Sequence, residues 1–143
     1  MNTILDNKIT LDRETHRYSL LDNPEIVFTS VTTYLDYFFE GFDGEKVAKK
    51  LIANVPKYKG RTVESLLDEW DESARYGTMV HDEIENWIKN RAEPKDLKSI
   101  NGKNWLQKYQ TKSGIEFLSE VIIYSKELKI AGTVDILAKD NNT

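Results

Sequence analysis

Residues 117–139, FLSEVIIYSKELKIAGTVDILAK, decide the fold of this chain. They contain two runs with the apolar pattern of β-strands, joined by the charged segment 126–129, and this order predicts a hairpin. In the first run, the consecutive apolar residues 121–123 indicate a mostly buried strand. The second run places Asp135 among apolar neighbours, namely Ile130, Val134, Ile136 and Leu137.

An aspartate in such a strand needs a partner. Burying an unpaired carboxylate is costly, so we expect Asp135 to face a wet cleft or to meet a cation, for example a metal ion. Gly132, three residues earlier, lets another group approach the backbone closely. The alternative is an aspartate at a strand end that bonds to a neighbouring turn.

The composition is that of one soluble domain. The chain has 143 residues, of which 39% are hydrophobic and 31% are charged. No apolar run approaches the ~20 residues of a membrane span, and the N-terminus has no signal-peptide pattern, so we expect no membrane partner. The absence of cysteine excludes disulfides and thiolate metal sites, so a metal bound by this chain needs His, Asp or Glu as ligands.

The charged residues are distributed unevenly along the chain, although its net charge is only −4 and its pI is near 5.3. Residues 46–61 hold six basic side chains and no acidic one, whereas residues 62–85 hold eight acids and the single base Arg75. Two explanations stay open: solvated helix faces, or a basic rim that contacts phosphate groups around an acidic metal site. The basic rim would consist of Lys46, Lys49, Lys50, Lys57, Lys59 and Arg61.

Local patterns predict the remaining elements. Strand-like runs at 8–12, 17–21 and 25–29, separated by polar breakers, predict a small antiparallel meander. Helices are predicted at 31–39 after the N-cap Ser30, at 45–54, at a segment that begins after Thr62, and at 99–112 before Gly114. We expect two apolar stripes to face the core: Leu66, Leu67 and Trp70 in the third helix, and Trp105, Leu106 and Tyr109 in the last.

Residues 75–89 predict an amphipathic helix, with Val80, Ile84, Trp87 and Ile88 as its apolar stripe. His81 and Glu85 are four residues apart beside this stripe, so their side chains can touch and are directed toward the domain. This placement suits a metal ligand and its partner. A His–Glu pair on the surface is the alternative.

Three motifs in this order resemble the RecB-like branch of the PD-(D/E)XK nuclease superfamily: GTMVH at 77–81, Glu120 in one strand and GTVD at 132–135 in the next. Four further segments look like the N-terminal region of phage and mitochondrial exonucleases of that branch, so the resemblance covers nearly the whole chain. They are ITLD at 9–12, HRY at 16–18, SVTTYL at 30–35 and EW at 69–70.

The resemblance implies a metal-dependent DNA nuclease, of the exonuclease type, that hydrolyses phosphodiester bonds. It implies that His81 and Asp135 bind Mg²⁺ or Mn²⁺ and that Glu120 is a third catalytic residue. Glu85 would support these residues without binding the metal itself. The DNA would be single-stranded or have free ends, and the protein would serve DNA repair or recombination in the cytoplasm of a bacterial or phage-infected cell.

The implied fold is α+β and restriction-endonuclease-like: a mixed sheet flanked by helices, within a single domain that spans 1–143. Residues 1–29 would form the meander, 30–113 a helical region and 114–143 the core hairpin.

The family also has a third strand with Asp/Glu-x-Lys, about a dozen residues after the metal-binding aspartate. We interpret residues 139–143 as the turn after the Asp135 strand, and the matches at 6–8, 93–95 and 127–129 lie upstream of Asp135, in the wrong order. We therefore expect an incomplete, inactive nuclease fragment that lacks the C-terminal part of the core and associates with itself through an exposed sheet edge. The alternative is a non-catalytic nucleic-acid-binding or protein-interaction domain on the same scaffold.

Overall fold

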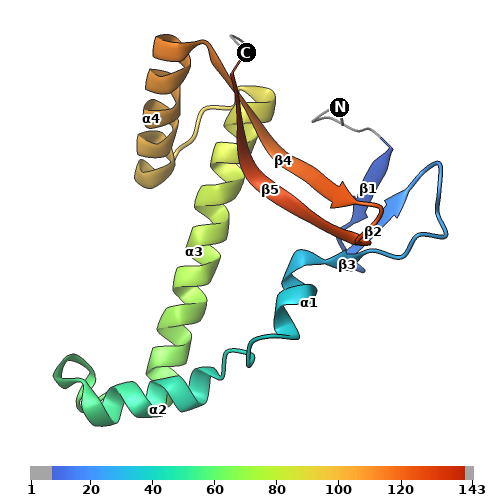
Figure 1. Cartoon of the computed structure of the whole chain (residues 1–143). Coiled ribbons are helices and arrows are strands. Elements are labelled where there is room, and N and C mark those ends of the chain that lie inside the picture. Colours follow the sequence, from blue (N-terminus) through green and yellow to red (C-terminus); the bar gives the residue numbers. More distant parts are fainter. Residues whose placement is uncertain (1–7, 141–143) are drawn as a thin grey trace.

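The structure, a computed structural model that describes residues 8–140, is a mixed α+β fold (Figure 1). This agrees with the α+β class expected from the sequence. None of the helices in the described range has the length and apolar composition needed to cross a membrane. In chain order the elements are β1 (Ile9–Asp12), β2 (Arg17–Leu20), β3 (Thr29–Ser30), α1 (Val31–Asp36), α2 (Gly44–Asn54), the 3₁₀ turn η1 (Pro56–Tyr58), α3 (Val63–Asn90), α4 (Leu97–Ser113), β4 (Ile115–Ser125) and β5 (Ile130–Asp140).

The predicted hairpin is the longest paired structure in the molecule. β4 and β5 pair antiparallel from Ile115↔Asp140 to Ser125↔Ile130. β3 pairs in parallel with the first two residues of β5, which gives a mixed sheet in the order β3-β5-β4. The interpretation of 139–143 as a turn is wrong for Lys139 and Asp140, because β5 continues through them and Lys139 forms an ion pair with its cross-strand partner Glu116 at 3.7 Å. Residues 141–143 lie outside the described range.

The predicted N-terminal meander is corrected by the structure. β1 and β2 form an antiparallel pair, but the third run does not add to it, and Thr29 and Ser30 pair with β5 instead. The cause is a shared apolar core: Phe28, just before β3, is buried in one cluster with side chains of both sheets. These are Ile9, Tyr18, Leu20 and Ala131.

The helix predicted after Thr62 and the one predicted at 75–89 form one continuous helix, α3, of 28 residues. The Thr62 hydroxyl caps it by accepting the Ser65 N–H at 3.1 Å. α4 ends at Gly114, whose φ of 64° is left-handed, as expected for a helix-terminating glycine. A second core cluster joins α3, α4 and β4, and consists of Trp87, Ile88, Leu106 and Phe117.

Several apolar side chains expected inside are exposed. α1 keeps the predicted N-cap Ser30 but ends at Asp36, and none of its side chains is buried. α4 packs through Leu106, so Trp105 and Tyr109 lie on its outer side and contact each other, with ring centroids 4.5 Å apart. Ile123 is also exposed, although it belongs to the run expected to be mostly buried. Leu66 of the third predicted helix is fully buried, as expected.

These exposures reflect an open arrangement of the elements. In Figure 1, α3 and the β4–β5 hairpin diverge from the end where α4 packs, and α2 crosses the opposite end of α3. The chain has 10,955 Å² of accessible surface, whereas a compact monomer of 16.6 kDa has about 7,600 Å². The exposed surface includes large apolar side chains, among them Phe38, Phe39 and Phe42.

Candidate metal centre

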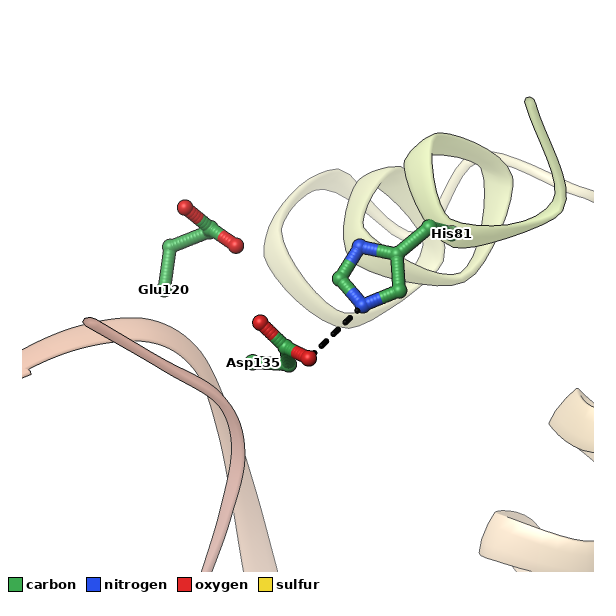
Figure 2. Close-up of side chains that lie close together, drawn as sticks. All are labelled: His81, Glu120 and Asp135. Carbon is green, nitrogen blue, oxygen red and sulfur yellow. Dashed lines mark ion pairs between the residues drawn. The ribbon is translucent and has the colours of Figure 1, made fainter. Parts of the chain in front are cut away.

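Three side chains from separate elements converge at one place (Figure 2): His81 of α3, Glu120 of β4 and Asp135 of β5. The His81 Nε2 atom lies 3.1 Å from the Asp135 Oδ2 atom. One possible ligand atom from each of the three residues lies within 4.8 Å of the other two. The expected convergence of His81 and Asp135 is confirmed, and Glu120 faces the same space. Their roles as ligands stay a prediction.

The register of the hairpin explains why the two carboxylates meet. Ser119 pairs with Ile136 and Val121 with Val134, so Glu120 and Asp135 fall at the same level of the hairpin, between two paired positions. Glu120 also has a left-handed backbone, with φ of 55°. A non-glycine residue in that region costs about 1–3 kcal/mol, and like charges opposite each other on neighbouring strands repel. Two unfavourable features thus coincide at the position where a cation would offset the repulsion.

Asp135 is exposed rather than buried: 67% of its side chain is accessible, compared with 20% for Glu120. The expected wet cleft beside Asp135 is therefore confirmed, and the expected cation stays a prediction. Glu120 and Asp135 both line a cleft of about 590 Å³, between the β1–β2 hairpin, the start of α1 and the β4–β5 hairpin. The Tyr18 hydroxyl and the Thr133 hydroxyl, 3.1 Å apart, connect two of these walls.

Arg13, in the turn between β1 and β2, also reaches the cluster. Its Nη2 atom lies 3.4 Å from the Glu120 Oε2 atom and 3.8 Å from the Glu85 Oε1 atom. Glu85 is held in turn by Lys89 Nζ at 2.5 Å. Glu85 is therefore linked to the three converging residues through Arg13. Nothing in the sequence pattern distinguishes Arg13 from other turn residues, so the contact between Arg13 and Glu120 could not be predicted from the sequence.

The six residues of the basic rim do not surround the cluster. They belong to α2, η1 and the residues beside them, which contact the N-terminal part of α3 through the Phe42–Trp70 ring pair and the Arg61–Glu69 ion pair. Trp70 and His81 are eleven residues apart on α3, which corresponds to about 16 Å along the helix axis. A role for these basic residues in nucleic-acid contact stays a prediction.

Comparison of the chain with protein-family models, curated proteins and solved structures found no match. Its function therefore has to follow from the geometry and chemistry of the site.

Proposed function

We propose that His81, Glu120 and Asp135 bind one Mg²⁺ or Mn²⁺ ion, and that the chain carries the metal site of a RecB-like PD-(D/E)XK deoxyribonuclease with a restriction-endonuclease-like fold. One observation carries the proposal: an imidazole nitrogen and two carboxylates, brought from three elements, lie within 4.8 Å of one another. Carboxylate oxygens suit hard divalent cations such as Mg²⁺ and Mn²⁺, and imidazole is a ligand of first-row transition metals.

The donor set fits such an ion. Ligands of Mg²⁺ lie about 2.1 Å from it, so two ligands on opposite sides are about 4.2 Å apart. The observed upper limit of 4.8 Å exceeds this by an amount that small side-chain rotations remove, because His81 and Asp135 are 46% and 67% exposed. A positive ion would also offset the repulsion between Glu120 and Asp135.

A bound Mg²⁺ or Mn²⁺ would supply Lewis-acid chemistry, by polarising a phosphate oxygen and acidifying a water molecule. The chain's own residues hold the site in shape. His81 Nε2 and Asp135 Oδ2 lie 3.1 Å apart, so both side chains are already directed to the place where the ion would bind, and Arg13 contacts the carboxylate of Glu120 at 3.4 Å. The open cleft beside them leaves room for a nucleic-acid strand.

This set of residues is sparse for efficient hydrolysis. Three ligands leave about half of an octahedral shell to water, and no lysine is among the described residues that line the cleft. We therefore expect metal-dependent DNA binding with little cleavage by this chain. The missing lysine equally favours the second candidate function, a nucleic-acid-binding domain without catalysis.

DNA binding and cleavage, measured with labelled single- and double-stranded oligonucleotides in Mn²⁺ or EDTA, test the proposal. We expect EDTA and Asp135→Ala to weaken binding to the same degree, and any trace of cleavage to disappear in both. Asp71→Ala is the matched control, because Asp71 is an exposed acid of α3 about 15 Å along the helix from His81. Binding that is unaffected by EDTA and by Asp135→Ala would contradict a metal-dependent nuclease site.

A further inference from the structure

Arg13 combines an exposed guanidinium with two much less accessible carboxylates. The Arg13 side chain is 71% exposed, whereas Glu120 and Glu85 are 20% and 18% exposed. The two Arg13–carboxylate distances of 3.4 and 3.8 Å are long for an arginine ion pair. Arg13 also lines the cleft, together with His16 and Tyr18 of the same hairpin. The guanidinium therefore touches the acidic cluster loosely and keeps most of its five N–H donors available.

The turn that carries Arg13 is held firmly. The Asp12 carboxylate accepts the backbone N–H groups of Glu14 at 2.9 Å and Thr15 at 3.2 Å, which closes the turn after β1. The β1–β2 pair is attached to β5 through the core cluster around Tyr18 and through the Tyr18–Thr133 hydroxyl contact. The backbone of Arg13 is thus fixed relative to Asp135, although its side chain is free to move.

We propose that Arg13 exchanges partners: it neutralises Glu120 when no metal is bound, and it binds a phosphate group of a nucleic-acid strand when a divalent cation takes that carboxylate. This rests on the proposed metal site. A cation at Glu120 weakens the attraction between the guanidinium and the carboxylate. The planar fork of donors then matches two oxygens of a phosphate, which the metal also draws into the cleft.

The exchange predicts effects of opposite sign in one variant. Arg13→Gln removes a cation that competes for Glu120, so Mn²⁺ should bind about two- to fivefold more tightly. The same variant loses a charged phosphate contact, so an oligonucleotide should bind about tenfold more weakly in saturating Mn²⁺. The slope of log affinity against log salt concentration should also become shallower by about one unit, which corresponds to the loss of one phosphate contact. Arg13→Lys keeps the charge without the fork, so it should lose only part of the oligonucleotide affinity.

The test uses the whole chain, with Mn²⁺ binding followed by electron paramagnetic resonance and oligonucleotide binding by fluorescence anisotropy. Arg17→Gln is the matched control, because Arg17 is on the same hairpin and is not among the described residues that line the cleft. Tighter Mn²⁺ binding with weaker oligonucleotide binding in Arg13→Gln alone supports the exchange. If Arg13→Gln weakens both the Mn²⁺ affinity and the oligonucleotide affinity, or changes neither, the exchange is wrong and Arg13 only links the elements structurally.

The two proposals fail in different ways. If the unaltered chain binds no Mn²⁺, the metal site is wrong and the exchange falls with it. If the unaltered chain binds Mn²⁺ and the oligonucleotide, but Arg13→Gln matches it in both affinities, the metal site stands and the exchange alone is wrong.

Discussion

A methyl group at Gly132 would collide with the start of α1. A Cβ atom at this position would lie 2.8 Å from Val31 Cγ2 and 3.4 Å from Val31 Cβ. Non-bonded carbons prefer about 3.5–4.0 Å, and the branched valine side chain has little freedom to rotate away in a helix. Relief therefore requires α1 to move by about 1 Å. This contact is the close approach that the sequence predicted at Gly132.

The cost of Gly132→Ala in the free energy of unfolding follows from the interactions at the start of α1. Ser30 pairs with Ala131 of β5 and accepts the Thr33 N–H at 3.0 Å, so a shift of α1 strains both interactions. Overpacking of this kind costs about 1–3 kcal/mol, and the lower entropy of the unfolded chain with alanine offsets about 0.4–1 kcal/mol. With the middle of both ranges, the net loss in the free energy of unfolding is about 1.3 kcal/mol, which corresponds to a fall of about 4–5 °C in melting temperature.

Thermal melts of four chains test this reasoning: the unaltered protein, Gly132→Ala, Val31→Ala and the double variant. Val31 is 44% exposed, so Val31→Ala alone should cost less than about 1 kcal/mol. Because the small side chain makes room, the double variant should melt above Gly132→Ala. Equal melting of Gly132→Ala and the unaltered protein, or no rescue by Val31→Ala, would refute the close approach.

Three further predictions concern stability and association. The backbone N–H of Asp96 donates to Glu83 and lowers the pKa of that carboxyl. The stabilisation is present above the unfolded-state pKa and is lost as pH falls through the lower folded-state pKa. In urea melts below about pH 4.5, the stability of Glu83→Gln should therefore depend less on pH than that of the unaltered chain, and an equal dependence would contradict this. Leu106→Ala should cost about 2–5 kcal/mol and Trp105→Ala far less, because only Leu106 is buried; equal thermal shifts would contradict the packing of α4. Within the described residues, the edge of β5 that faces away from β4 has no strand partner beyond Ala131. Sedimentation should therefore detect concentration-dependent self-association, which Ile136→Lys should reduce. A chain that stays monomeric at every concentration would contradict this prediction.

The sequence predicted features that depend on near neighbours. The N-cap Ser30, the helix start after Thr62, the terminator Gly114 and the β4–β5 hairpin all follow from patterns a few residues long, and the structure contains each of them. The meeting of His81 and Asp135 was also predicted, because each is a polar side chain beside an apolar pattern and the family resemblance assigns both to one metal.

The features that the sequence did not predict depend on contacts between distant segments. The apolar spacing of Trp105 and Tyr109 indicates a buried face only if another element covers it, and the described part of the chain has none there. The segment before Ser30 has a strand-like pattern that fits either sheet. Burial of Phe28 in the shared core favours the observed pairing of Thr29 and Ser30 with β5. The reach of Arg13 to Glu120 spans 107 residues of sequence, beyond any local pattern.

Mn²⁺ binding to the chain, with the melting temperature as a second readout, tests the metal centre most directly. We predict saturable binding of one ion per chain, and about 2.7 kcal/mol of added stability when the free metal concentration is 100 times the dissociation constant. Asp135→Asn, which keeps the side-chain shape and removes the charge, should abolish both effects, whereas Asp71→Asn should leave them unchanged. Absence of saturable binding, or binding that persists in Asp135→Asn, would contradict a metal site built from His81, Glu120 and Asp135.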